Sequence, residues 1–265
     1  MDMPQPAALI TGASSGIGET FARELSRKGY RLILAARRRE RLLKLAEELG
    51  EAEVLPVDLS LDSSVLEIEK KIASEPNLEF LINNAGFGVP GRFFETDIDA
   101  LDRMYRVHVI AIERLTHAAL KGMVPRGKGN VINVSSVAGF FTTLDSTSYS
   151  STKAWINSFT EGLHIELKNL KSTVRVQALC PGFTHTEFHD VIKMDRSKIH
   201  KSLWMTSEFV VRESLKGLEK NRLFVIPGWR YRFFVKLIQF LPRSLKHFIA
   251  LKMGTHPTLS NISES

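Results

Sequence analysis

Residues 7–18 read Ala-Ala-Leu-Ile-Thr-Gly-Ala-Ser-Ser-Gly-Ile-Gly, a short apolar run that leads directly into a glycine-rich turn. A helical pattern starts at Ile17, so the turn joins a predicted strand to a predicted helix. In that context Gly12 permits a tight turn, Gly16 lets the backbone approach a pyrophosphate, and Gly18 allows close helix–sheet packing. The helix N-terminus adds N–H groups and a positive dipole. A turn without a ligand can have the same sequence, but the stretch predicts a dinucleotide site formed by Gly12, Ser14, Ser15, Gly16, Ile17 and Gly18.

The rest of the chain alternates short apolar runs with longer helical patterns. The runs lack polar alternation, as expected for strands whose two faces are both covered by helices. Predicted strands are 7–11, 32–36, 53–57, 80–83, 131–135, 174–179 and 223–226. Predicted helices are 17–28, 38–49, 63–74, 99–123, 149–170 and 207–220. The pattern predicts an α/β fold in a single domain, with a Rossmann-type doubly wound parallel seven-stranded sheet and helices on both faces.

Composition narrows the class of protein. The chain has 265 residues, of which 43% are hydrophobic and 25% charged, as in ordinary soluble proteins. The net charge is +7, and residues 222–253 contain seven Lys or Arg and no acid. The excess of positive charge therefore belongs to that segment, and a general nucleic-acid surface is not expected.

Cys180 is the single cysteine and is expected to be a small buried residue. No leader-like segment precedes the first strand and no apolar run reaches the ~20 residues of a membrane helix, which favours a cytoplasmic protein. We predict no metal site.

The end of the second predicted strand bears on the choice of cofactor. An NAD-preferring site places an acid there to hold the ribose 2′-hydroxyl. Here the strand is followed by Arg37, Arg38 and Arg39. Arg37 can clamp a 2′-phosphate with charge-assisted hydrogen bonds, so we predict NADP(H) as the cofactor. The other arginines are equally explained as the solvated start of a helix.

Two further strand ends carry candidate cofactor residues. Asp58 and Leu59 follow the third strand, and Asp58 is placed either to bond the adenine or to cap the next helix. Asn84, Ala85 and Gly86 follow the fourth strand. Small residues and an amide there would let the backbone pass close to a ribose, and would also suit a structural turn.

A tyrosine, a lysine and a serine suggest the chemistry. Hydride transfer to a carbonyl places negative charge on its oxygen, so a proton donor must lie within hydrogen-bond reach. Tyr149 can donate, although a free phenol has a pKa near ~10. Lys153 follows one helical turn later, on the same face, and would lower that pKa and bind the nicotinamide ribose. Ser136 would hold the substrate oxygen. Tyr and Lys at this spacing often occur by chance, but rarely together with such a serine and the glycine motif.

Together these motifs resemble those of the short-chain dehydrogenase/reductase family. The likeness spans residues 7–228 and rests on the glycine motif, Asp58, Asn-Asn-Ala-Gly at 83–86, Asn-Val-Ser-Ser at 133–136, Tyr-Ser-Ser-Thr-Lys at 149–153, and Pro181-Gly182 with Thr186. The resemblance implies that Ser136, Tyr149 and Lys153 are catalytic and that Asn84 and Ala85 line the cofactor. It also implies that the segment with Pro181, Gly182, Thr184 and Thr186 embraces the nicotinamide carboxamide. A homodimer or homotetramer is expected, with helices 99–123 and 149–170 pairing between subunits.

One position departs from the family pattern. An asparagine in the fifth helix usually helps to organise a water relay to the lysine, whereas this chain has His108 between two valines. We include His108 among the candidate catalytic residues. It could bond the same water, titrate near neutrality, break the relay, or serve a structural purpose.

Apolar residues border the expected position of the reactive carbonyl. They are Phe87, Ala138, Phe140, Phe141, Leu144, Phe183 and Phe188. Residues 183–205 form a long insertion after a strand end, where ligands bind in open α/β sheets, and are expected to form a substrate lid. A hydrophobic ketone or aldehyde is the predicted substrate, although some of these aromatic residues can equally belong to the core.

The C-terminal segment, 229–265, is predicted to be an amphipathic helical extension and tail outside the cofactor-binding and catalytic domain of residues 1–228. Trp229, Phe233, Phe234, Leu237, Ile238 and Leu241 form an apolar helical face, and Pro242 interrupts the helix. That face can pack over the pocket or a neighbouring subunit. Alternatively, residues 229–253 can attach peripherally to an anionic membrane.

The sequence predicts an NADPH-dependent carbonyl reductase, or in reverse a secondary alcohol dehydrogenase, that acts on a small hydrophobic carbonyl or alcohol with Tyr149 as general acid/base. Two alternatives come from other classes of protein: a noncatalytic NADP(H)-binding sensor or scaffold, and a membrane-surface adaptor that uses the C-terminal helices.

Overall fold

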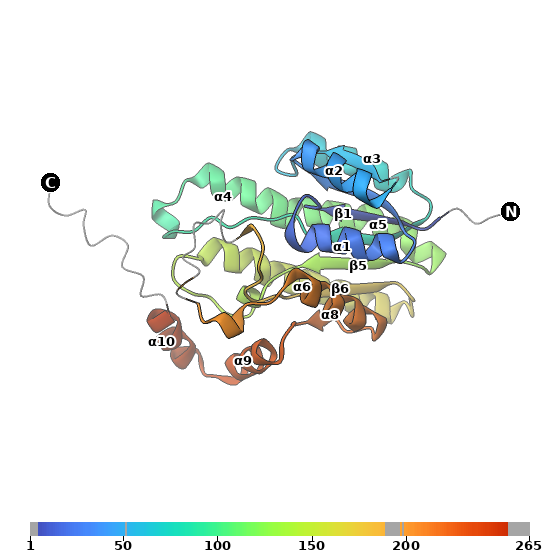
Figure 1. Cartoon of the computed structure of the whole chain (residues 1–265). Coiled ribbons are helices and arrows are strands. Elements are labelled where there is room, and N and C mark those ends of the chain that lie inside the picture. The colour runs from blue at the N-terminus through green and yellow to red at the C-terminus, as the bar shows by residue number, and fades with distance from the viewer. Residues whose placement is uncertain (1–4, 51, 189–196, 198, 254–265) are drawn as a thin grey trace, which may run out of the picture.

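The computed structural model describes residues 5–50, 52–188, 197 and 199–253. Seven parallel strands form one sheet in the order β3-β2-β1-β4-β5-β6-β7 (Figure 1). The strands are β1 Ala7–Thr11, β2 Arg31–Ala36, β3 Glu53–Pro56, β4 Leu78–Asn83, β5 Asn130–Val134, β6 Arg175–Leu179 and β7 Phe224–Val225. The longer helices are α1 Gly16–Arg27, α2 Arg39–Leu49, α3 Asp62–Ala73, α4 Ile98–Tyr105, α5 Ile112–Arg126, α6 Thr147–Asn169, α8 Ser207–Glu219, α9 Trp229–Phe240 and α10 Arg243–Met253. The predicted fold class is confirmed.

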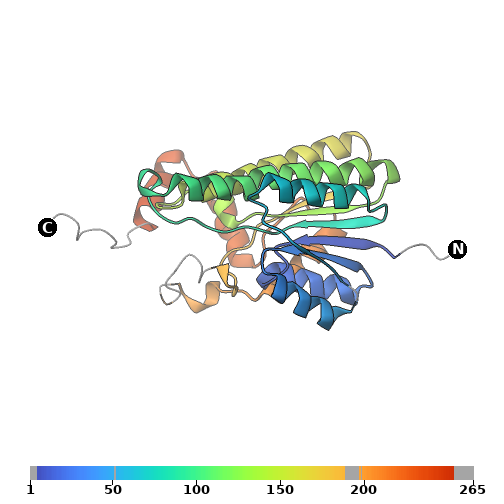
Figure 2. The same ribbon diagram turned by 90° about the horizontal axis from the view of Figure 1, so that it is seen from above.

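Both faces of the sheet are buried, which explains why its strands lack polar alternation. In β1, Ala7 and Leu9 point into the core beneath α3, α5 and α6, while Ala8 and Ile10 point into the core beneath α1, α2 and α8. Figure 2 shows the sheet between these two helical layers. Because alternate residues serve opposite cores, each strand must be apolar throughout.

The sheet topology determines where a ligand can bind. β1 pairs with β2 on one side and with β4 on the other, so the strand order reverses beside β1. All pairs are parallel, and the loops after β1, β4, β5 and β6 therefore gather at the carboxyl edge of the sheet, at the left in Figure 1. This is the switch point at which open α/β sheets bind ligands.

The helix predicted at 99–123 extends from Ile98 to Arg126, but its middle is not an α-helix. Residues Arg106–Ala111 form a π-helical segment, η2, between α4 and α5. The wider turn contains His108, whose side chain is fully buried. π-Helical turns inside α-helices often mark functional sites.

The segment after β6 returns to the body before α8 begins. Thr184 forms a parallel bridge with Met205, so the two ends of this segment lie side by side. Thr206 caps α8 by accepting a hydrogen bond from Phe209 N at 3.2 Å. Of the predicted lid, residues 189–196 and 198 lie outside the described residues.

After β7 the chain forms α9 and α10, which are separated at Leu241 and Pro242 as predicted. Among the described helices, none has both the length and the apolar character needed to span a membrane.

Candidate active site

The glycine-rich turn after β1 forms a cradle with no room for larger residues. Gly12 and Gly16 have positive φ values of 65° and 58°. A Cβ on Gly12 would lie 2.8 Å from Asn84 Nδ2, and one on Gly18 would lie 2.3 Å from Gly12 O. Ser15 is the N-cap of α1 and makes no capping hydrogen bond with its side chain. The backbone at this helix N-terminus is thus shaped as a pyrophosphate site requires.

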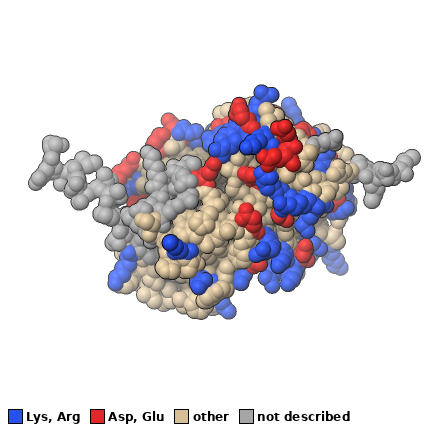
Figure 3. Space-filling model, viewed as in Figure 1, with Lys and Arg blue, Asp and Glu red and all other residues tan. Residues whose placement is uncertain are grey.

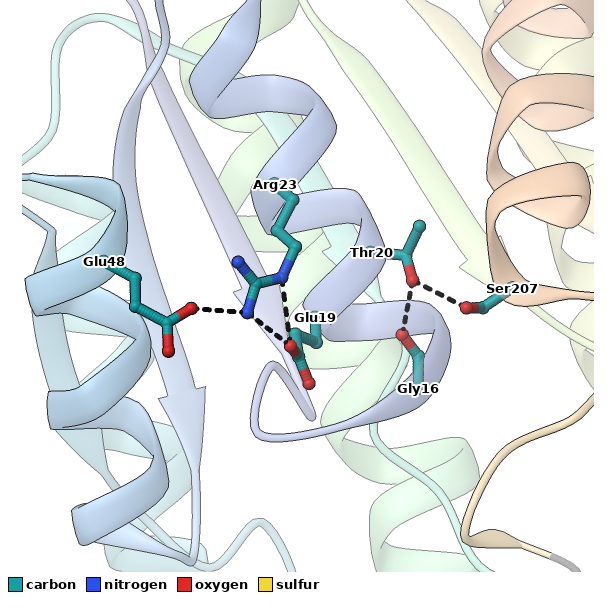
Figure 4. A network of polar contacts seen from close by, with 6 residues as sticks. All are labelled: Gly16, Glu19, Thr20, Arg23, Glu48 and Ser207. Carbon is teal, nitrogen blue, oxygen red and sulfur yellow. Dashed lines mark hydrogen bonds and ion pairs between the residues drawn. The ribbon is translucent and has the colours of Figure 1, made fainter.

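Polar contacts fix α1 relative to its neighbours (Figure 4). Thr20 Oγ1 donates to Gly16 O at 2.9 Å and lies 2.8 Å from Ser207 Oγ at the start of α8. On the other side of α1, Arg23 bridges Glu19 of the same helix and Glu48 of α2. The orientation of the glycine-rich turn is therefore set by helices on both sides.

Arg38, rather than Arg37, contacts the glycine-rich turn. Its Nη2 donates to Ser15 Oγ at 2.8 Å and its Nε to Ser14 Oγ at 3.2 Å, whereas Arg37 is exposed. Sequence reasoning assigned Arg38 to the solvated start of a helix and missed this contact. The available signal was its position as the residue before α2, after a strand that neighbours β1 in the sheet.

Glu187 joins this arginine cluster from the segment after β6. Its carboxylate accepts from Arg41 Nη1 at 2.5 Å and from Arg38 Nη1 at 2.7 Å. These hydrogen bonds lower the pKa of Glu187. A cavity of about 350 Å³ opens here, and its lining includes Ser15, Gly16, Arg41, Thr186 and Glu187. Glu187 thus engages guanidinium groups of both Arg38 and Arg41 at the edge of this cavity.

Asp58 braces its own turn. Its Oδ1 accepts from Ser60 N at 2.9 Å and from Ser60 Oγ at 2.8 Å. The N-cap of α3 is Leu61, so the alternative that Asp58 caps this helix is wrong. Leu59 is 7% exposed and its side chain belongs to the core.

The loop after β4 packs against the glycine-rich turn. Asn84 Nδ2 donates to Thr11 O at 3.0 Å and to Gly12 O at 3.2 Å, and Ala85 N donates to Thr11 Oγ1 at 3.0 Å. Gly86 has a different constraint, because a Cβ there would lie 2.7 Å from His108 Nε2. The small residues that sequence analysis assigned to ribose approach thus also make room for protein neighbours.

Ser136, Tyr149 and Lys153 are brought together at the carboxyl end of β5. Ser136 is close enough to the Tyr149 phenol to lower its pKa, and the Ser136 Oγ accepts from Ala138 N at 3.1 Å. Tyr149 is half-buried, and burial raises the pKa of its phenol to about 12, against a lowering by the neighbouring Ser136 hydroxyl. The phenol is therefore protonated across the physiological pH range.

The Lys153 ammonium lies beside the Tyr149 ring. Its Nζ donates to Val134 O at 2.9 Å and lies 5.5 Å from the Tyr149 ring centroid. A backbone carbonyl holds the ammonium in this position, and Ser136 lowers the pKa of Tyr149 against the effect of burial. Burial lowers the pKa of Lys153 to about 8.

His108 is a neutral cross-link. Its Nε2 accepts from Phe87 N at 3.1 Å, so we assign the ring proton to Nδ1, which lies 2.9 Å from Thr152 Oγ1. Thr152 in turn donates to Tyr149 O at 2.8 Å. Burial, reinforced by the Lys153 charge, moves the pKa of His108 well below its ordinary value, so the alternative of titration near neutrality is wrong. Both ring nitrogens bond protein atoms, which does not fit the alternative of a bond to a relay water.

The segment after β6 contacts the rest of the site at several points. Pro181 O accepts from Val137 N at 3.0 Å, and Thr184 is buried. The Thr186 side chain lies against Gly16, where a Cβ would approach it within 2.8 Å. A Cβ on Gly182 would lie 2.1 Å from the Tyr231 ring. The structure therefore places these predicted residues between the glycine-rich turn and α9.

Tyr231 is a residue that sequence analysis missed. Its Oη accepts from Phe183 N at 3.0 Å and donates to Leu203 O at 2.7 Å, so one phenol joins both ends of the segment. The predicted apolar face of α9 did not include Tyr231. The face that packs on the body consists of Tyr231, Val235 and Ile238. The available signal in the sequence was a tyrosine, whose ring can pack while its hydroxyl bonds, three and four positions before Phe234 and Val235.

Of the apolar residues assigned to the substrate side, only some lie near Tyr149 and His108. The Phe188 ring lies 5.8 Å from the Tyr149 ring, and Phe87 lies 6.1 Å from His108. Phe140 instead packs on Phe224 of β7. The remaining members have other surroundings: Phe141 contacts Phe234, Phe183 contacts Trp204, Ala138 is half-buried and Leu144 is exposed.

Comparisons with known proteins identify the family of this chain. The family model described as short chain dehydrogenase matches residues 6–197. An uncharacterized oxidoreductase of Staphylococcus aureus (strain USA300) is 36% identical over 183 residues, covering 68% of this chain and 78% of that protein.

Two solved structures are similar along most of the chain. A short-chain dehydrogenase from Sphingobium yanoikuyae in complex with NADPH has 30% identity and a TM-score of 0.80, covering 90% of this chain and 97% of that chain. The bulky-bulky ketone specific alcohol dehydrogenase from Comamonas testosteroni has 29% identity and a TM-score of 0.77, covering 91% and 97%. The chain therefore belongs to the short-chain dehydrogenase family of NAD(P)-dependent oxidoreductases.

Proposed function

We propose that the protein is an NADPH-dependent carbonyl reductase, or in reverse a secondary alcohol dehydrogenase, acting on hydrophobic ketones or aldehydes. The observation that carries the proposal is the gathering of three groups: the Lys153 ammonium lies 5.5 Å from the Tyr149 ring centroid, and Ser136 is close enough to the Tyr149 phenol to lower its pKa. These groups lie at the carboxyl edge of the sheet, as does the glycine-rich cradle.

In the proposed reaction the bound reduced nicotinamide supplies a hydride. Tyr149 donates its phenolic proton to the carbonyl oxygen, on which negative charge develops. Ser136 Oγ hydrogen-bonds to the same oxygen and positions it beside the phenol. The pKa of Tyr149, about 12, keeps the donor protonated at neutral pH.

Lys153 has two proposed tasks. An ammonium has three N–H donors, so it can hold a ribose hydroxyl in addition to Val134 O. A pKa of about 8 leaves most of the side chain charged at neutral pH, and this charge stabilises the phenolate that remains after proton transfer.

The residues beside the cradle support a preference for NADPH. Arg37 and Arg38 follow β2 where an NAD-preferring site would have an acid. Arg38 already reaches Ser14 and Ser15 at the cradle, and the Sphingobium yanoikuyae relative is a complex with NADPH. A 2′-phosphate would therefore meet two guanidinium groups, whose planar donors suit phosphate oxygens.

The surroundings of Tyr149 support a hydrophobic substrate. Phe188 lies against its ring, and Phe141 packs on Phe234 close to the serine loop. The relative from Comamonas testosteroni is specific for bulky ketones. We propose ketones or aldehydes with apolar groups on the carbonyl carbon.

We further propose a homodimer or homotetramer formed through α5 and α6. Ile165 and Leu170, at the end of α6, are 61% and 65% exposed, and burying such side chains favours association. The noncatalytic alternative rested on the histidine at position 108, and His108 has a bonding role beside an intact Ser136, Tyr149 and Lys153 set.

The test is NADPH oxidation by the purified chain with a panel of apolar ketones and aldehydes, each at matched concentration. Turnover of at least one apolar member, with charged members such as 2-keto acids inactive, supports the proposal. Binding of NADPH without turnover of any member would favour the sensor instead.

A further inference from the structure

Helix α9 has two opposite apolar faces, and only one of them packs on the protein. Tyr231, Val235 and Ile238 are 8%, 2% and 3% exposed. On the other side, Trp229, Phe233, Leu237 and Phe240 are 63%, 66%, 48% and 79% exposed. At 100° per residue these four side chains fall within an arc of about 80°. The apolar face that sequence analysis predicted for this helix is therefore, in large part, its outer face.

Helix α10 extends this apolar surface. Leu245, Phe248 and Leu251 are 42%, 53% and 59% exposed. In Figure 1 the two helices adjoin at the lower left of the molecule. We name the exposed apolar and basic residues of α9 and α10 the C-terminal surface. Scattered exposed apolar residues are ordinary, but seven large ones on two consecutive helices form a patch that marks an interaction site.

The charged residues of α9 and α10 are all basic, and one of them, Arg232, lies 3.4 Å from Glu213 of α8. Residues 229–253 contain six Lys or Arg and no Asp or Glu. The Arg230 guanidinium lies 4.8 Å from the Trp229 ring centroid, and the Lys252 ammonium lies 4.7 Å from that of Phe248. In Figure 3 the area over α9 and α10 shows blue and tan atoms without red ones. The aromatic residues and cations are thus interleaved on one surface.

We propose that the C-terminal surface docks in the plane of an anionic lipid bilayer. The exposed Trp, Phe and Leu side chains enter the headgroup and acyl boundary, while the flanking Arg and Lys contact lipid phosphates. A second copy of the chain fits this surface poorly, because a symmetric contact would place the same cations opposite one another. None of the helices described is suited to span the membrane, so the attachment is peripheral.

The inner face of α9 connects this surface to the site. Tyr231 holds both Phe183 and Leu203, and Phe234 packs on Phe141 near the serine loop. Docking would therefore place the lipid on the outer side of the helix whose inner side fixes the segment beside Tyr149. The docking itself does not depend on the proposed reaction.

The test is co-sedimentation of the full chain with vesicles of phosphatidylcholine alone or mixed with phosphatidylglycerol. We expect binding to the mixed vesicles that weakens as salt increases, and little binding to phosphatidylcholine alone. The double variant Phe233→Ser/Phe240→Ser should lower the partition coefficient at least about tenfold. The matched control Leu43→Ser/Leu66→Ser changes exposed leucines on α2 and α3 and should bind like wild type.

A second pair of variants tests the charges. Arg230→Glu/Lys236→Glu should weaken binding to the mixed vesicles by about fivefold or more per position, whereas Lys44→Glu/Lys121→Glu should change it far less. Thermal melting and NADPH binding confirm that each variant folds. The proposal is overturned if wild type does not bind mixed vesicles, or if the Phe233/Phe240 variant binds equally well. It is also overturned if light scattering shows that this variant dissociates an oligomer and wild type binds no lipid.

Discussion

The Nδ1 atom of His108 lies 2.9 Å from the Oγ1 atom of Thr152, the residue before Lys153. The opposite ring nitrogen accepts a hydrogen bond from Phe87 N. A π-helical turn thus fastens the loop after β4 to α6, the helix that carries Tyr149 and Lys153. His108 is a positioning residue in this arrangement, and it acts through the helix.

Replacing His108 by Phe should keep the ring volume and remove both hydrogen bonds. Leaving the partly buried Phe87 N–H and the buried Thr152 hydroxyl without this partner should cost about 1–3 kcal/mol each. We expect a lower free energy of unfolding in urea and a lower kcat, with KM changed less. His108→Asn, which keeps polar atoms, should lose less of both. Wild-type stability and kcat in His108→Phe would contradict the cross-link.

The stability contribution of His108 should depend on pH. Its folded pKa is well below the ordinary value near ~6.5, so the unfolded chain takes up the proton first as pH falls. The contribution is full above ~6.5 and decreases from there down to the folded pKa. Between pH 7 and 5 the melting temperature of wild type should therefore fall more than that of His108→Phe. Parallel curves for the two proteins would show that His108 titrates normally.

Arg37→Asp should reverse the cofactor preference. A carboxylate at the end of β2 repels a 2′-phosphate and can bond a 2′-hydroxyl. Fluorescence titration should show tighter NADPH than NADH binding in wild type and the opposite order in this variant. Arg39→Asp makes the same charge change at the first residue of α2 and is the matched control. Equal affinity of wild type for the two cofactors would refute the 2′-phosphate proposal.

Glu187→Gln should strengthen NADPH binding. Glu187 holds both Arg38 and Arg41 through charged hydrogen bonds, and a phosphate must compete with it. We expect the NADPH dissociation constant to fall about threefold or more, with that of NADH nearly unchanged, because exposed ion pairs contribute up to about 1 kcal/mol. Glu208→Gln removes a carboxylate from the same cavity without these arginine contacts. Weaker NADPH binding in Glu187→Gln would argue that the carboxylate assists the cofactor.

Tyr231→Phe should loosen the segment after β6. The change removes the hydrogen bonds to Phe183 N and Leu203 O, each of which contributes about 1 kcal/mol. KM for the carbonyl substrate should rise while NADPH affinity stays the same, and proteolysis between 183 and 205 should accelerate. Tyr105→Phe, on the exposed end of α4, is the control. An unchanged KM and proteolysis rate would mean that the segment is held by other contacts.

Local sequence patterns predicted the strands well. All seven predicted strands are present with bounds within two residues, because each is a short apolar run between helical patterns. The π-helical turn at His108 left no such signal. It depends on the partners Phe87 and Thr152, which are 21 and 44 residues away in the sequence.

The site was predictable where spacing along one element determines it. Tyr149 and Lys153 share a helical face, so their proximity follows from the sequence. The direction of the Lys153 ammonium does not, because Val134 O on another element accepts its hydrogen bond. The contacts of Arg38 with Ser14, Ser15 and Glu187 likewise join three separate segments. Long-range side-chain partners of this kind require the folded structure.

The most direct test of the account is the turnover of Tyr149→Phe with an apolar ketone that wild type reduces. The phenyl ring keeps the packing on Phe188 and removes only the hydroxyl that donates the proton. We predict that kcat falls by about 10²- to 10⁴-fold, while NADPH binds with unchanged affinity. A variant that retains NADPH binding and turns over within a fewfold of wild type would contradict Tyr149 as the proton donor.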